Sequence, residues 1–208
     1  MWTFYFSPNT CSLASHIALE DAGADFELCR LDFGKTEQRS DSYMAINPKA
    51  RVPTLVTPQG VLTETPAILA FVAQSFPAAR LAPVDDALAF AQAQSFNSYL
   101  CSTVHVAHAH GRRGYRWADD PQAIKAMQHK VPESMTQAFM VIEQHLLKGP
   151  WVMGAAYTIC DPYLFALARW LEADGAALER LPRVLEHRQR MSERATVRKA
   201  IAAQFDGA

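Results

Sequence analysis

Hydrophobic and polar residues form short alternating blocks over the first third of the chain, and a helical period follows. Trp2 to Phe6 is an aromatic-rich run typical of a strand, and Phe26 to Leu31 resembles a second strand. Between them, Ser12 to Ala22 has the apolar spacing of a helix that Gly23 ends. A strand, a helix and a strand at this spacing predict a right-handed βαβ unit with parallel strands.

A hairpin and a helix are predicted next. Val52 to Thr57 and Val61 to Thr63 are two short strand-like runs joined by a Pro-Gln-Gly turn. Thr65-Pro66 then begins a helix, since proline is favoured in the first helical turn. One face of this helix repeats every fourth residue and is expected to lie on the sheet: Ile68, Val72 and Phe76. The first domain is therefore predicted to have the order βαβ followed by ββα.

The remainder of the chain has a helical pattern almost throughout. We expect an α/β domain at residues 1–79, a linker at 80–86 and an all-helical domain at 87–208. A long helical run from Ile124 to Leu147 contains Pro132, where a kink or an interruption is predicted. Thr158 to Asp161 has the spacing of a capping box, with aspartate in place of the usual glutamate.

Composition and charge exclude several classes of protein. The chain has 208 residues and a net charge of −1, so it lacks the basic excess that nucleic-acid binding requires. No stretch reaches the roughly 18 apolar residues of a membrane span, and the first residues do not resemble a signal peptide. We therefore expect a soluble, cytoplasmic protein with no nucleic-acid or membrane partner.

Four cysteines are present and no pair has the C-x-x-C spacing, so neither a zinc site nor a dithiol motif is indicated. Cys29, Cys101 and Cys160 are expected to be small buried hydrophobes. Cys11 differs because it follows a strand and begins a helix, where unpaired N–H groups favour a thiolate. The position predicts a lowered pKa for Cys11. Ala14 stands where a second cysteine would, so Cys11 has no local disulfide partner.

Two further motifs could bind a peptide-like ligand. Val52-Pro53 precedes a strand, and a cis bond there would turn the backbone of Val52 outward to pair with a peptide group. Glu64-Thr65 lies at a helix N-terminus, where the side chains could simply cap the helix. Alternatively, Thr65 and the helix end could bind a carboxylate while Glu64 binds an ammonium group. Together with Cys11, these motifs describe a ligand with a thiol, a peptide group and an α-amino-acid end.

The same segments resemble those of the glutathione transferases, nearest the bacterial beta class. The similarity is carried by Phe4 to Leu13, Asn47 to Pro53, Leu62 to Ile68 and Thr158 to Asp161. It implies a thioredoxin-like first domain, a helical-bundle second domain, a homodimer, glutathione as co-substrate and a role in detoxification. Cys11 and His105 would be catalytic. The resemblance implies that the residues binding glutathione are Lys35, Val52, Pro53, Glu64, Thr65 and Asn97, with Ser98 as the alternative to Asn97 at the dimer interface.

The segment from His105 to Trp117 is richer in histidine and arginine than is usual for the family. Its histidines could ligate a metal, although no carboxylate is nearby in sequence, and no metal site is predicted. It could be a solvated basic turn. It could also bind an acidic or aromatic co-substrate, with the substrate pocket formed by His108, Arg112 and Tyr115.

The resulting hypothesis is a glutathione transferase that transfers glutathione to a small electrophile, acidic or aromatic in character. One alternative is a thiol–disulfide reductase in which Cys11 forms a mixed disulfide with glutathione. A second alternative is a glutathione-binding protein of the same fold that has no catalytic activity.

Overall fold

A mixed four-stranded sheet forms the centre of the first domain. The computed structural model describes residues 1–205, and its sheet has the order β2-β1-β3-β4. The strands are β1 (Trp2–Phe6), β2 (Phe26–Arg30), β3 (Thr54–Thr57) and β4 (Gly60–Thr63). β1 pairs with β2 in parallel and with β3 antiparallel, and β3 forms a hairpin with β4. This topology confirms the predicted βαβ–ββα order and the thioredoxin-like fold.

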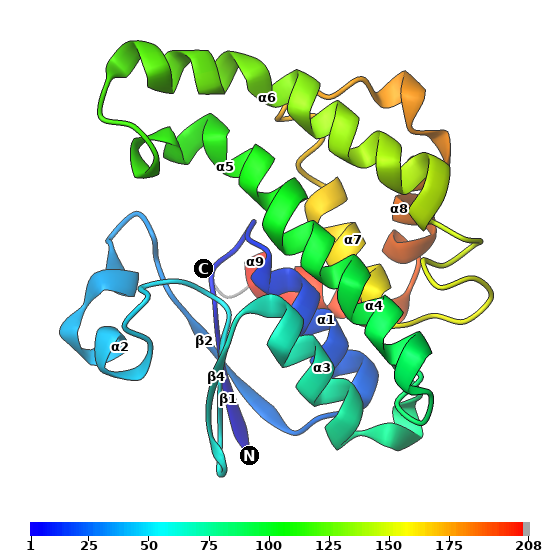
Figure 1. The fold of residues 1–208 in the computed structure, drawn as a ribbon. Helices are drawn as coiled ribbons and strands as arrows, with labels where there is room; N and C mark the ends of the chain where they lie inside the picture. Colours follow the sequence, from blue (N-terminus) through cyan, green and yellow to red (C-terminus); the bar gives the residue numbers. More distant parts are fainter. Residues whose placement is uncertain (206–208) are drawn as a thin grey trace.

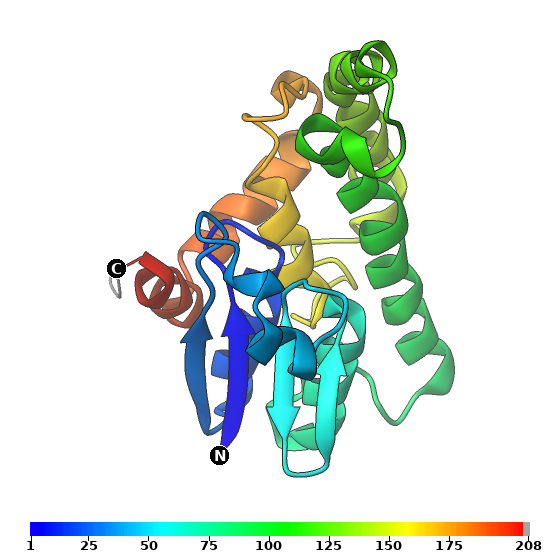
Figure 2. The same cartoon turned by 90° about the vertical axis from the view of Figure 1, so that its left-hand side faces the viewer.

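Helices cover both faces of the sheet. α1 (Ser12–Ala22) and α3 (Thr65–Ser75) lie on one face, and the short α2 (Asp41–Ile46) lies on the opposite face (Figures 1 and 2). α1 is almost entirely buried, which explains why its sequence has a weak amphipathic contrast. Gly23 ends it with a φ of 65°, a conformation that glycine adopts without a steric penalty.

The second domain is helical. In Figure 1, α4, α5 and the π-helical turn between them form one long rod, and α6 lies beside its α5 end. α7 lies against α1 and so joins the two domains. The elements are α4 (Ala87–Tyr99), η3 (Leu100–Val104), α5 (His105–Arg113), α6 (Pro121–Val141), η5 (Ile142–Leu146), α7 (Cys160–Ala168), α8 (Pro182–Ser192) and α9 (Ala195–Phe205).

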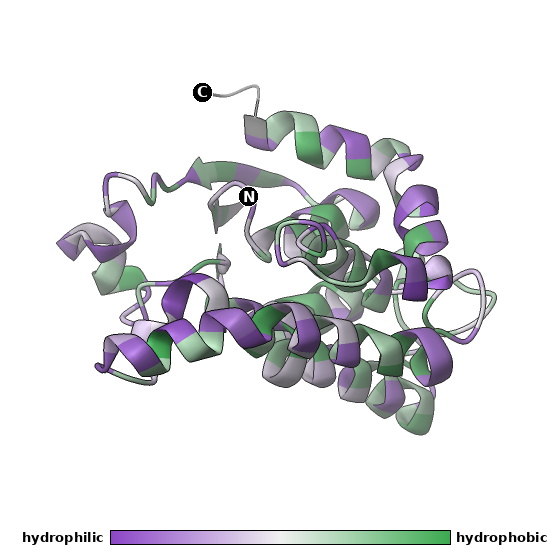
Figure 3. Cartoon of the chain, turned by 90° about the horizontal axis from the view of Figure 1, so that it is seen from above, coloured by the Kyte–Doolittle hydropathy of each residue, from purple (hydrophilic) through white to green (hydrophobic). Residues whose placement is uncertain are grey.

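Apolar residues are concentrated where the two domains meet. One continuous cluster of buried side chains includes Phe4 and Leu55 of the sheet, Ile17 of α1 and Leu164 of α7. In Figure 3 the outer helices carry both hydrophilic and hydrophobic segments, as expected of helices with one face on the core. Among residues 1–205, no helix is long and apolar enough to cross a membrane.

One local prediction is corrected and another is confirmed by the structure. α6 continues through Pro132 without interruption, and the Thr136 hydroxyl donates to the Pro132 carbonyl at 2.7 Å. In the segment before α4, Leu81 is buried and its carbonyl accepts from Ile159 N–H, so this segment packs against the helical domain. Asp161 confirms the capping box, since its carboxylate accepts from Thr158 N–H at 2.7 Å.

Candidate active site at the start of helix α1

A cleft opens between the two domains at the N-terminal end of α1. Its first part, of about 300 Å³, is lined by residues that include Cys11, Thr65, Cys101 and Tyr163, and we call it the thiol cavity. Its second part, of about 760 Å³, is lined by residues that include Asn9, Phe33, Tyr115 and Trp170, and we call it the loop cavity. Cys11, Arg51, Val52, His105, Arg113 and Arg116 line both.

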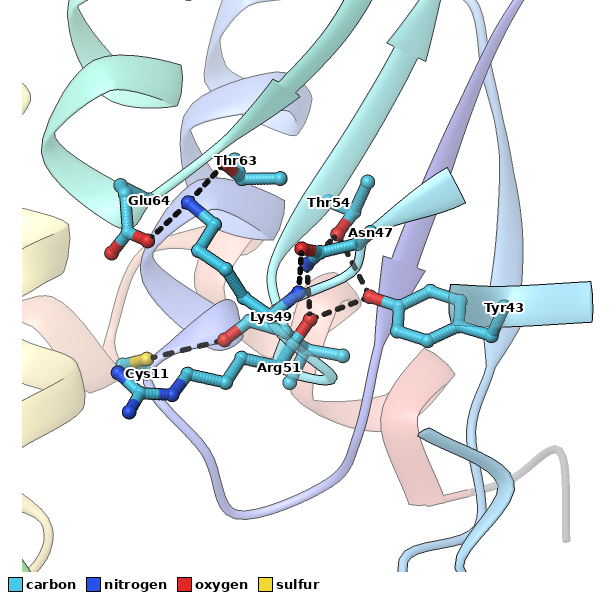
Figure 4. A network of polar contacts seen from close by, with 9 residues as sticks. Cys11, Tyr43, Asn47, Lys49, Arg51, Thr54, Thr63 and Glu64 are labelled. Atoms are coloured by element: carbon cyan, nitrogen blue, oxygen red, sulfur yellow. Dashed lines mark hydrogen bonds and ion pairs between the residues drawn. The ribbon is translucent and has the colours of Figure 1, made fainter. Parts of the chain in front are cut away.

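Cys11 is the N-cap residue of α1, as its position in the sequence indicated. Its side chain is buried, with 7% exposure, and its Sγ donates to the Val52 carbonyl at 3.9 Å (Figure 4). Burial raises the pKa of the Cys11 thiol to about 11, and the smaller opposing effects of Thr65 and Arg113 do not reverse this. The predicted lowering of the pKa is therefore wrong. Desolvation of the thiolate outweighs the favourable field of the helix terminus.

The Val52-Pro53 peptide bond is cis. The turn before it is held by hydrogen bonds to the Arg51 carbonyl from the Tyr43 hydroxyl at 2.6 Å and the Asn47 amide at 2.8 Å. Figure 4 shows this network beside Cys11, with Thr54 bonded to both Tyr43 and Asn47. These bonds fix the backbone of the turn, which carries Val52 into the wall of the cleft.

Glu64 and Thr65 lie at the start of α3 and line the thiol cavity. The N-cap residue Glu64 has a φ of 72° and makes no side-chain capping bond, so simple capping by this residue does not occur. Its carboxylate instead accepts from Lys49 Nζ at 2.5 Å, and Lys49 also donates to Thr63 at 2.6 Å (Figure 4). Sequence reasoning missed Lys49, although it lies inside the Asn47–Pro53 segment that carries the family resemblance.

His105 begins α5 and lines both cavities. Burial, and secondly the positive charge of Arg113, lower the pKa of His105 to about 3. The imidazole is therefore neutral at neutral pH and can accept a hydrogen bond. His108, one turn further on, stacks on Trp170 at 4.0 Å and bonds to Asp174 at 2.8 Å. His108 and Tyr115 both line the loop cavity, as their proposed place in a substrate pocket requires.

Three of the residues named from the sequence are not brought into the cleft. The side chain of Lys35 is 75% exposed and pairs with Asp32 at 3.8 Å. Arg112 is exposed and lines neither cavity. Asn97 is fully buried at 0% exposure within α4, so it is not available to reach a partner subunit, and this expectation is corrected. The apolar pattern of α4 did not reveal which of Asn97 and Ser98 faces inward.

The cleft also contains residues that sequence reasoning did not select. Arg51, Arg113 and Arg116 line both cavities, and Cys101 and Tyr163 line the thiol cavity with Cys11. The helical period indicated only that these side chains lie on helices. Residues 1–205 contain no cluster of three or more metal-ligating side chains of the histidine, cysteine or carboxylate type.

Comparisons with known proteins agree with this geometry. The sequence model of the glutathione S-transferase N-terminal domain matches residues 1–74. Glutathione S-transferase GstA of Escherichia coli O157:H7 is 32% identical over 203 residues, which are 96% of this chain and 97% of the relative.

Solved structures agree over the whole chain. A glutathione transferase homologue from Sulfitobacter with bound glutathione has 42% identity and a TM-score of 0.92, covering 100% of this chain and 98% of that one. A sphingomonad glutathione S-transferase complexed with glutathione has 30% identity and a TM-score of 0.84, covering 97% and 98%. With the thioredoxin-like domain, the helical domain and the cleft at Cys11, these matches show that the chain belongs to the glutathione S-transferase family and is an enzyme that uses glutathione as its co-substrate.

Proposed function

We propose that this enzyme conjugates glutathione with a small electrophile in the cleft between the two domains. The observation that carries the proposal is the convergence of Cys11, Val52, Thr65 and His105 on one cavity from four different segments of the chain. Holding the thiol and the electrophile together in such a cleft supplies a large part of the rate enhancement of a bimolecular reaction.

Glutathione binding is assigned to the first domain. Thr65 and the free N–H groups at the start of α3 suit the γ-glutamyl carboxylate, because a helix N-terminus favours an anion. The Glu64 carboxylate suits the ammonium group of the γ-glutamyl end. It would then bind both this ammonium group and Lys49. The Val52-Pro53 turn suits the cysteinyl peptide group, which would bring the sulfur of glutathione to Cys11. Lys35 is too exposed to be assigned a contact.

Cys11 is assigned the role of a hydrogen-bond donor to the glutathione thiolate. A thiol with a pKa of about 11 is protonated at neutral pH, and a protonated thiol is a poor nucleophile towards a disulfide. Neutral His105 is suited to accept a hydrogen bond from the glutathione thiol, and its lowered pKa leaves the proton to solvent when the thiolate forms. These two states favour conjugation over the reductase alternative, in which Cys11 itself would be the nucleophile.

The assembly, the domain division and the compartment are also proposals. A homodimer is typical of the family, and the exposed Ser98 replaces the buried Asn97 as the residue that could reach the partner subunit. We retain residues 1–79 as the glutathione-binding domain, 80–86 as the connection and 87–208 as the helical domain. All four cysteines are free thiols, which is consistent with a reducing cytoplasm.

Conjugation of 1-chloro-2,4-dinitrobenzene by wild type, Cys11→Ala and Thr65→Ala tests the proposal. We expect activity in the wild type, a raised KM for glutathione in Thr65→Ala and residual conjugation in Cys11→Ala. Mass spectrometry after incubation with oxidised glutathione separates the reductase alternative. A stoichiometric Cys11 adduct, together with complete loss of conjugation in Cys11→Ala, would support the reductase and contradict the proposal.

A further inference from the structure

Three guanidinium groups line the cleft, and no carboxylate in the described part of the chain neutralises them. Arg51, Arg113 and Arg116, which we call the arginine cluster, each line both the thiol cavity and the loop cavity. Within residues 1–205, none of them forms an ion pair, whereas Lys49 at the same cleft is paired with Glu64 at 2.5 Å. Like charges held together without a counter-ion repel each other, so the cluster favours a bound anion.

Arg113 is the least solvated member of the cluster. Its Nε is buried and has no hydrogen-bond partner among residues 1–205, and one of its terminal nitrogens lies 3.4 Å from His105 Nε2. Burial lowers the pKa of Arg113, and the neighbouring Arg116 and Arg51 lower it further. A buried donor without a partner costs free energy, and a ligand carboxylate or sulfonate would remove that cost.

Part of the wall around the cluster is apolar and aromatic. Trp117, which is 49% exposed, lines the thiol cavity together with Val106, Ala109 and Tyr163. Glu64 is the sole carboxylate that lines either cavity in the described part of the chain, and Lys49 already binds it. A ligand with a flat apolar body and a negative group matches these walls better than a neutral or cationic one does.

Glutathione alone does not account for all of this positive charge. Of its two carboxylates, we assign the γ-glutamyl one to Thr65, which leaves the glycyl carboxylate for a cation. Arg39 and Lys49, besides the arginine cluster, line the loop cavity and can serve that end. Arg113 and Arg116 belong to α5 and the turn after it, on the helical-domain side of the cleft, where the electrophile is expected to bind.

We propose that Arg113 and Arg116 bind the negative group of the electrophile, so that the enzyme prefers anionic aromatic electrophiles. This inference rests on the conjugation proposed above. With 4-chloro-3-nitrobenzoate as probe, the glutathione thiolate would attack the carbon that bears chlorine, a C–S bond would form, the C–Cl bond would break and chloride would leave. The proton of glutathione passes to water, and no oxidant or reductant is needed.

The test compares this acidic probe with neutral 1-chloro-2,4-dinitrobenzene, which reacts by the same steps. The readout is the ratio of kcat/KM for the acidic probe to kcat/KM for the neutral probe, because any change in the glutathione thiolate cancels in it. Arg113→Gln and Arg116→Gln are each expected to lower this ratio about tenfold or more, since a charge-assisted hydrogen bond is lost. Arg112→Gln is the matched control on the same helix, and it should leave the ratio unchanged.

Three outcomes would overturn the inference. The ratio could be unchanged in both variants, or it could fall equally in Arg112→Gln, which would indicate a diffuse charge effect. Both probes could also lose activity equally with a raised KM for glutathione, which would assign the arginines to glutathione itself. If circular dichroism shows that Arg113→Gln does not fold, the ratio measured for Arg116→Gln serves as the test, because Arg116 is exposed. Absence of activity of the wild type on either probe would instead contradict the proposed conjugation.

Discussion

Both ends of helix α1 contact the helical domain. The polar group at the C-terminal end is paired within the protein, whereas those at the N-terminal end are weakly paired. At the C-terminal end, the carboxylate of Asp21 is almost fully buried and accepts bonds from Tyr157, Arg194 and Thr196. At the N-terminal end, within residues 1–205, the Cys11 thiol has one weak hydrogen bond at 3.9 Å, and the arginine cluster around it has no carboxylate partner.

This difference separates a structural contact from a binding site. Buried polar groups are normally paired within the protein, and groups left unpaired are expected where a ligand completes them. The Asp21 carboxylate accepts from three donors within the protein, so it joins the domains and needs no ligand. At the Cys11 end, the thiol and the arginine cluster lack strong partners within residues 1–205, and glutathione and an electrophile could supply them. The following experiments test this contrast.

Removal of the Asp21 carboxylate is expected to have the largest effect on stability. Asp21→Ala leaves Tyr157 and Arg194 without their partner in a partly buried place, and should cost about 3 kcal/mol or more of unfolding free energy. Urea denaturation measures this. Glu186→Ala is the control, because it breaks the exposed Glu186–Arg190 pair and should change stability by less than about 1 kcal/mol. Equal losses in the two variants would contradict the assignment.

The reactivity of Cys11 tests the other end of α1. Because burial raises its pKa to about 11, little thiolate is present at pH 7.5 without glutathione. Alkylation by iodoacetamide should therefore be on the order of 100-fold slower than for an unperturbed thiol, and should accelerate as the pH rises towards 11. Mass spectrometry of the tryptic peptide measures the rate, and Cys101→Ser removes the second thiol of the cavity. An alkylation midpoint below pH 8 would show that the helix terminus lowers the pKa of Cys11 by more than burial raises it.

His16, in the middle of α1, predicts a pH dependence of stability. It is fully buried, and burial lowers its pKa to about 4. The unfolded chain then binds more protons than the folded one between about pH 6.5 and 4, so stability falls as the pH falls through this range.

Between pH 7.5 and 5.0 this histidine should account for a loss of about 2 kcal/mol, and His16→Leu should remove that part of the loss. Urea midpoints at the two pH values measure it. The lowered pKa of His105 causes a similar loss of unfolding free energy, and this loss remains in His16→Leu. A variant with an undiminished pH dependence would show that His16 does not titrate as its burial requires.

The Lys49–Glu64 pair at the rim of the cleft should have the smallest effect. Both side chains are about half exposed, and an exposed ion pair contributes little because solvent screens it. Lys49→Ala is therefore expected to change the free energy of unfolding by less than about 1 kcal/mol. A larger loss in thermal or urea denaturation would mean that this pair, like the Asp21 contact, is structural.

Much of this fold could be predicted from the sequence, because hydrophobic period and turn residues determine local structure. Gly23 ended α1, and Thr65-Pro66 began α3, as predicted. The environment of Cys11 could not be predicted in the same way, since its burial depends on helices contributed by the second domain. The arginine cluster was likewise hidden, because Arg51 and Arg113 are far apart in sequence and meet only across the cleft.

The orientation of single side chains on α4 was also beyond the sequence. Asn97 and Ser98 are adjacent polar residues, and a helical period with few charges does not distinguish which one faces the core. The structure buries Asn97 and exposes Ser98. The register of a helix is therefore reliable where its apolar stripe is strong and ambiguous where small and polar residues alternate.

A crystal structure of the enzyme soaked with glutathione tests most directly the claim that the incomplete end of α1 is the binding site. The expected result is a glutathione sulfur about 3.5 Å from Cys11 Sγ, with the γ-glutamyl carboxylate bonded to Thr65. Glutathione bound elsewhere, or bound in the cleft with its sulfur turned away from both Cys11 and His105, would contradict it.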